Sequence, residues 1–152
     1  RAEIAQVDRE AGTVVAALRE LAGRVTLVDS ALQAADPVHV HQERLRLESL
    51  LAAETDPQMR VERQRVLDSV TSQAESLARL ARLREKLLTR AQTAASDLEG
   101  LAARTGELVA VGTSAYDGDP AGQILADLTM SLESVRTGLA EAEEVSRGLP
   151  DA

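Results

Sequence analysis

Apolar residues recur at alternating spacings of three and four along most of this chain. Within residues 2–35 the pattern starts at Ile4 and Val7, and all ten of its positions are apolar. It returns through residues 57–110 and again through residues 120–148. A three-four spacing held over several heptads places these side chains on one stripe of an α-helix, as in coiled coils. The pattern therefore predicts long helices that pack along one another.

Three Asp-Pro dipeptides divide these helices. An Asp before a helix accepts a hydrogen bond from a free backbone N–H, and a Pro at the first helical position loses only an N–H that had no partner. The dipeptides are Asp36-Pro37, Asp56-Pro57 and Asp119-Pro120. At the first two, the alternative is a kink in a continuous helix. Within a single domain they predict helices over about 2–35, 37–55, 57–110 and 120–148.

Composition favours an all-α fold. The chain has 152 residues, of which 44% are hydrophobic and only 1% aromatic, so aliphatic side chains must form the core. An unbroken helix over residues 57–110 would be roughly 80 Å long. We therefore expect an elongated antiparallel helical bundle or coiled coil with this segment as its central helix. Such an arrangement resembles spectrin-type repeats and the long helical hairpins of bacterial stress and division scaffolds.

Charge is sorted along the chain. The net charge is -4 over residues 1–56, +2 over residues 57–112 and -6 over residues 113–152, which gives -8 in total. A basic central helix between acidic helices has complementary edges, which select partner and orientation. Two copies of the central helix would bring like charges together around Arg79 to Arg90. We therefore expect the central helix to pack within its own chain rather than with another copy.

The best local signal for an anionic partner is a basic stripe on the central helix. It lies beside a leucine-rich surface, as in amphipathic helices that bind phospholipids. Alternatively, the acidic first and fourth helices cover it. Tyr116 is the only aromatic residue and is a further candidate contact, since aromatic side chains are enriched at binding hot spots. The stripe consists of Arg79, Arg82, Lys86 and Arg90.

Polar residues interrupt the apolar pattern of the central helix at three positions, namely Arg63, Gln73 and Arg84. Polar residues at such seam positions commonly fix register or oligomeric state, and an arginine can extend its guanidinium past an apolar stem to water. The sequence does not identify the groups that these side chains meet.

The inventory for catalysis is poor. The sequence contains no cysteine, no nucleophile elbow, no phosphate-binding loop and no dinucleotide motif. Its two histidines, His39 and His41, would point in nearly opposite directions on a helix and so would not share a metal. The net negative charge argues against non-specific nucleic-acid binding. We expect no enzyme activity, cofactor, metal site or small-molecule substrate.

These observations predict a non-enzymatic scaffold or protein–protein interaction module built on coiled-coil packing, which binds a protein partner or self-associates. The alternative is a domain that senses an anionic membrane surface through the basic face of residues 77–90. Arginine supplies 16 of the 17 basic residues, a bias that favours a GC-rich bacterial source. Because the chain begins with Arg1, we expect it to be part of a larger protein. We expect a cytoplasmic location, with the soluble part of a membrane-associated protein as the alternative.

Overall fold

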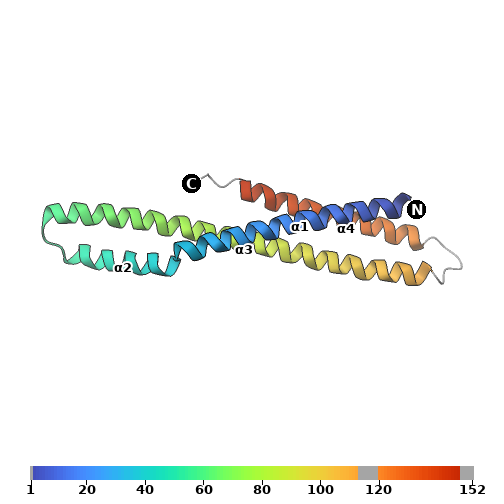
Figure 1. The fold of residues 1–152 in the computed structure, drawn as a ribbon, viewed down its shortest axis with the longest axis horizontal. Coiled ribbons are helices and arrows are strands. Elements are labelled where there is room, and N and C mark those ends of the chain that lie inside the picture. Colours follow the sequence, from blue (N-terminus) through green and yellow to red (C-terminus); the bar gives the residue numbers. More distant parts are fainter. Residues whose placement is uncertain (1, 113–119, 148–152) are drawn as a thin grey trace. The chain divides into compact units, whose positions relative to one another are not determined.

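A computed structural model describes residues 2–112 and 120–147, and in these residues all regular structure is helical. Four helices follow one another along the chain (Figure 1). They are α1 (Ala2–Ala35), α2 (Pro37–Ala53), α3 (Pro57–Gly112) and α4 (Pro120–Arg147). The predicted all-α fold with one long helix is confirmed, since α3 alone contains 56 residues.

Three of the helices begin at the proline of an Asp-Pro dipeptide. At the start of α2 the Asp36 carboxylate accepts a hydrogen bond from the backbone N–H of His39 at 3.2 Å. At the start of α3 the Asp56 carboxylate accepts one from the N–H of Gln58 at 3.0 Å. These bonds satisfy backbone donors that have no partner inside the helix.

Asp36 is also the joint between α1 and α2. Its φ of 47° and ψ of 77° lie in the left-handed region, and among the described residues it is the only non-glycine with a positive φ. Pro37 disfavours the right-handed helical conformation at the residue before it. Asp tolerates the left-handed region better than most residues. The chain therefore changes direction at one residue, with no intervening loop.

The helices form two compact units. The first, here the three-helix unit, combines α1 as far as Arg24 with α3 from Lys86 onward and α4. The second, here the hairpin unit, comprises residues Val25–Glu85, which include the end of α1, all of α2 and the first half of α3. The continuous helix α3 contributes to both units. The single domain expected from the sequence stays a prediction.

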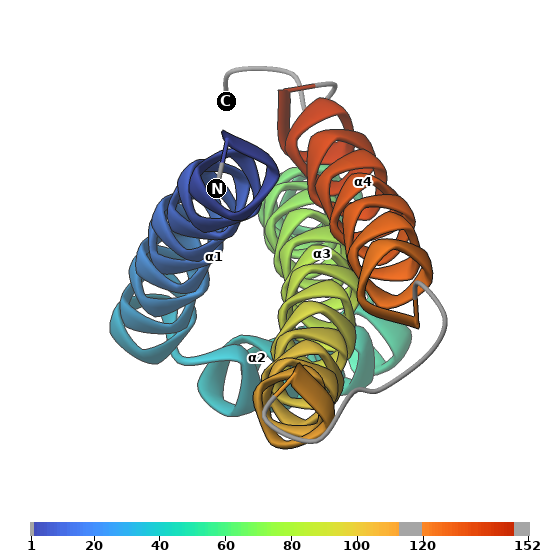
Figure 2. The same ribbon diagram turned by 90° about the vertical axis from the view of Figure 1, so that its right-hand side faces the viewer.

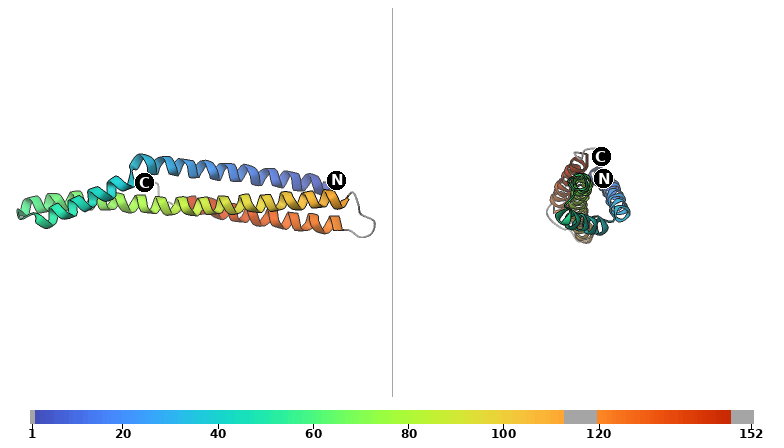
Figure 3. Two further views of the ribbon diagram at one scale, coloured as in Figure 1. Left: turned by 90° about the horizontal axis from the view of Figure 1, so that it is seen from below. Right: turned by 90° about the vertical axis from the view of Figure 1, so that its left-hand side faces the viewer.

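In the three-helix unit α4 runs antiparallel to α3, because Arg90 contacts Glu141 and Arg104 contacts Ser131 (Figure 3). The end view in Figure 2 shows α1 and α4 on either side of α3. In the described part of this unit, the buried side chains are all apolar. They are Val14, Leu21, Leu87, Ala94, Leu101, Leu128, Leu132, Val135 and Leu139.

The hairpin unit has a smaller core. Here α2 turns back along the first half of α3, and the last turns of α1 lie against α3 near Arg84, which pairs with Asp29. The buried side chains of this unit are Val25, Val40, Leu47, Leu67 and Leu83. Only three of these lie in residues 37–75, so the hairpin itself has few fully buried groups.

Asp36→Ala is expected to lower the free energy of unfolding by about 1–2 kcal/mol, because alanine removes the N-cap and is less tolerant of the left-handed conformation. Asp36→Asn should stay within about 0.5 kcal/mol of wild type, because asparagine caps helices and tolerates that conformation. Urea unfolding followed by circular dichroism measures both changes. Equal losses in the two variants would show that neither the cap nor the backbone conformation matters.

Candidate interaction surface

The hairpin leaves one apolar row of α3 uncovered. The row on α3 that faces α2 contains Arg63, Leu67 and Val70, which are half-buried or buried. The adjacent row lies about 50° around the helix. It begins with Met59 and Val66, which are 42% and 49% exposed. Apolar side chains that coiled-coil packing normally buries are thus open to solvent here.

Further along, the same row becomes buried. Gln73 is exposed, Leu80 is half-buried, and Leu87 is only 1% exposed. The exposure of this row changes along α3 because α3 has different neighbouring helices in the two units. In the hairpin α2 contacts only the adjacent row, whereas Leu87 lies in the three-helix unit, where two other helices pack on α3.

On α2, the same side of the hairpin presents Leu50, which is half-buried. In an antiparallel helix pair, the positions that flank the contact on one side come from equivalent heptad positions of the two helices. This places Leu50 beside the exposed row of α3. Arg46 of α2 and Glu62 of α3 lie further out, at the two edges. We call the surface formed by Arg46, Leu50, Met59, Glu62 and Val66 the hairpin face.

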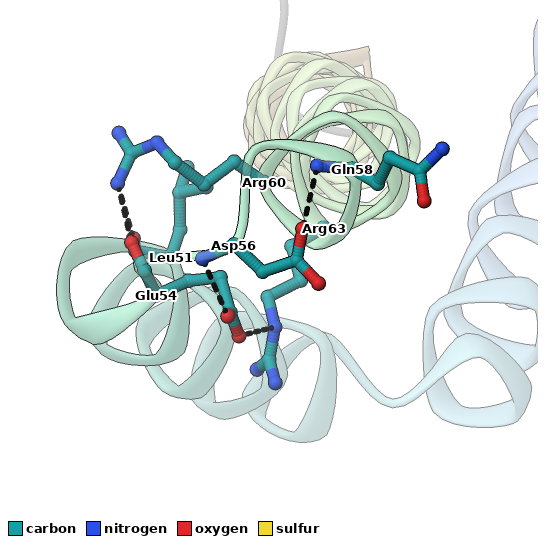
Figure 4. Close-up of polar contacts among 6 residues, drawn as sticks. All are labelled: Leu51, Glu54, Asp56, Gln58, Arg60 and Arg63. Atoms are coloured by element: carbon teal, nitrogen blue, oxygen red, sulfur yellow. Dashed lines mark hydrogen bonds and ion pairs between the residues drawn. The ribbon is translucent and has the colours of Figure 1, made fainter.

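The turn between α2 and α3 is held by side chains of α3 (Figure 4). Arg60 donates hydrogen bonds to the backbone carbonyl oxygens of Leu51, at 3.2 Å, and Glu54, at 2.9 Å. It thereby satisfies carbonyl groups at the end of α2 that have no helical partner. The Glu54 carboxylate accepts a bond from the N–H of Asp56 at 3.2 Å. These contacts fix how the two helices meet.

The structure supplies partners for two of the three polar seam residues. Arg63 Nε lies 3.0 Å from the Glu54 carboxylate, and both side chains are largely shielded from solvent. Arg84 forms an ion pair with Asp29 of α1 and a second with Glu85, at 2.9 Å. Gln73 differs, because no helix of the hairpin covers its row and its side chain is exposed.

Ion pairs shift the pKa of three side chains, namely Arg84, Glu43 and Arg46. The hydrogen bond to Asp29 raises the pKa of Arg84, since it stabilises the charged guanidinium. On α2 the hydrogen bond from Arg46 lowers the pKa of Glu43, and the same contact raises the pKa of Arg46. Glu43, Arg46 and Arg84 therefore keep their charge near neutral pH.

The four residues of the basic stripe are all exposed on α3. Arg79 donates to the Ser76 hydroxyl at 3.0 Å, and Arg90 contacts the Glu141 carboxylate at 3.3 Å. Within the described part of the chain, Arg82 and Lys86 have no carboxylate partner. Acidic helices therefore pair with one residue of the stripe. Tyr116 lies outside the described residues.

The leucines beside the stripe face the core. Leu83 and Leu87 are buried, and Leu77 and Leu80 are half-buried. A membrane could reach these side chains only if the helices that pack on them moved away. The exposed part of this region is basic rather than amphipathic.

The three-helix unit carries shallow grooves between its helices. One of about 180 Å³ lies between α1 and α4, and one of about 470 Å³ lies between α3 and α4. The larger is lined by apolar side chains and hydroxyl groups together with Arg90, Asp97 and Glu141. Neither groove contains a histidine or a buried charged group, and neither gathers an acid, a base and a nucleophile in one place.

Histidines and carboxylates do not gather elsewhere in the described residues. These residues hold no group of three or more potential metal ligands. His39 and His41 are both exposed, and the His41 ring lies 3.2 Å from the guanidinium of Arg44. None of the helices in this part of the chain is long and apolar enough to cross a membrane.

The sequence analysis did not identify Leu67 as a core residue of the hairpin. The heptad row counted from Met59 passes over Leu67, which is buried between α2 and α3. The spacing Arg63, Leu67, Val70 also alternates four and three and would have revealed it. The partners Glu54 and Asp29 carried no signal, because acidic residues are frequent on every helix of this chain.

In comparison with known proteins, no family model, no curated protein and no solved structure matches the chain.

Arg84→Gln and Asp29→Asn are each expected to lower the melting temperature, because each leaves the other group without its partner. The double variant should be destabilised by about as much as the larger single change, rather than by their sum. Thermal unfolding followed by circular dichroism measures this coupling. Arg82→Gln is the matched control and should leave the melting temperature unchanged. Additive losses would show that the ion pair contributes nothing.

Proposed function

We propose that this chain is a non-enzymatic interaction module that binds another protein, or another copy of itself, through coiled-coil packing on the hairpin. The observation that carries the proposal is the apolar row of α3 that is buried at Leu87 and open to solvent at Met59 and Val66. A row of this kind is the surface on which a further helix packs.

The energetics support this reading. Covering a half-exposed Val or Met side chain stabilises a complex by roughly 1 kcal/mol, at about 25 cal/mol for each Å² removed from water. The two contacts at Met59 and Val66 together give a weak interaction. The row also follows a heptad spacing, whereas the other exposed apolar residues of α2 and α3 do not join it.

A second function is favoured by one specific observation. Arg82 and Lys86 are exposed and have no carboxylate partner in the described part of the chain. Basic residues on a helix attract anionic lipid surfaces by about 1 kcal/mol each. We place this candidate second, because the neighbouring leucines are engaged in the core. The cytoplasmic location and the bacterial source expected from the sequence stay predictions.

Val66→Glu is expected to remove most binding of protein partners, because it places a charge in the middle of the exposed row. Proteins that bind to the immobilised variant are identified by mass spectrometry and compared with those that bind to the immobilised wild type. Val61→Glu is the matched control: Val61 is equally exposed, at 52%, and lies about 140° around the helix. The proposal predicts proteins captured by wild type and Val61→Glu and at least tenfold depleted with Val66→Glu. Identical capture by all three would contradict it.

Co-sedimentation with vesicles tests the second function. If lipid binding is the activity, the protein sediments with anionic vesicles and not with neutral ones. Arg79→Glu combined with Arg82→Glu should then abolish the binding, while Val66→Glu leaves it intact. The interaction-module proposal predicts no sedimentation with either kind of vesicle at physiological salt.

A further inference from the structure

We infer that the hairpin face binds the same face of a second copy of this chain, with both hairpins pointing in the same direction. The inference rests on the proposed function and names its partner. It follows from the position of one acidic and one basic residue at opposite edges of the face.

The two edges of the face carry opposite charges. Glu62 lies at the α3 edge, where its side chain is 65% exposed, and Arg46 lies at the α2 edge, where its side chain is 58% exposed. The two helices meet at a short turn, since α2 ends at Ala53 and α3 begins at Pro57. Residues equally far from this turn are therefore level, and at 1.5 Å per residue Glu62 and Arg46 lie within about one turn of each other along the hairpin.

The two edge charges of one copy can face the opposite charges of a second copy under one kind of two-fold symmetry. A two-fold axis parallel to the helices places α3 of one copy on α2 of the other and leaves every residue at the same height. Glu62 of each copy then meets Arg46 of the other copy, twice in the dimer. A two-fold axis across the helices instead places α3 on α3 and separates these charges. Charge complementarity therefore selects the dimer whose hairpins point the same way.

The same arrangement pairs the apolar residues. Met59 lies level with Leu50, so each Met59 comes to rest on Leu50 of the second copy, and Val66, about two turns further along α3, lies level with Glu43 of the second copy. None of these side chains needs to leave the core of its own hairpin. The apolar contact therefore forms from groups that are already at the surface.

The local partners of the edge residues do not prevent this exchange. Glu62 lies 3.6 Å from Arg65, and both side chains are mostly exposed. Such surface ion pairs contribute little to stability. Arg46 is bound more closely, with its Nη2 2.5 Å from the Glu43 carboxylate, but a guanidinium has five N–H donors and can serve two carboxylates.

The face is small. It spans about two turns of α3 and two helix widths, so the dimer buries on the order of 500 Å² in total, and we expect a weak, transient complex.

Sedimentation velocity of the whole chain from about 10 μM to about 1 mM, the range of weak complexes, tests the dimer. We expect the mass to rise from 16.2 kDa toward twice that value. Val66→Glu should weaken association at least tenfold. Val61→Glu, on another face of α3, should leave it within about twofold. Circular dichroism of each variant checks that the helices remain folded.

An exchange of charges provides the sharper test. Glu62→Arg alone and Arg46→Glu alone each oppose like charges across the interface and should weaken association about tenfold. The double variant E62R/R46E should restore it, because the pair re-forms in reverse. The local pairs with Arg65 and Glu43 are lost in the double variant as well, so restoration cannot come from them.

A chain that stays monomeric at the highest concentration overturns the inference, and so does a double variant that associates no better than the single ones. If the chain is monomeric while Val66→Glu still removes other captured proteins, only the identity of the partner is wrong. If Val66→Glu affects neither association nor capture, the proposed function fails with it.

Discussion

An apolar row on a long helix is stabilised when another helix covers it, and the coverage of α3 differs along its length. Its rows are covered in the three-helix unit, where α1 and α4 contribute the other half of the core. In the hairpin α2 covers one row and leaves the row of Met59 and Val66 open. The direction change at Asp36 has a direct role in this, because it ends α1 and begins the helix that packs on Leu67.

Polar residues in the packing stripe are tolerated because each meets an acid from another segment. Arg63 reaches Glu54 at the end of α2, and Arg84 reaches Asp29 of α1. Both arginines remain partly exposed, so neither charge is fully removed from water, and the desolvation cost of a buried ion pair is avoided. Each pairing is satisfied in only one alignment of the helices. These contacts therefore specify register more than they add stability.

Much of the fold follows from the sequence, and the surface does not. The Asp-Pro dipeptides mark helix starts because the chemistry is local: the carboxylate caps the helix that the proline begins. The heptad spacing predicts that α3 is long and packs along other helices. It does not reveal which row each neighbour covers, since the row from Met59 and the row from Arg63 both read as seams. That choice depends on where α2 lies around α3, which is set by the turn contacts of Arg60 and Glu54.

The difference in coverage along α3 can be measured directly by native-state hydrogen exchange. The account predicts that amides of residues 83–101, where two helices pack on α3, exchange more slowly than amides of residues 57–75, since protection follows buried apolar contacts. It also predicts that the difference narrows if the hairpin face becomes covered at high protein concentration. Equal or stronger protection of residues 57–75 in the dilute protein would contradict the claim that this part of α3 has an uncovered row.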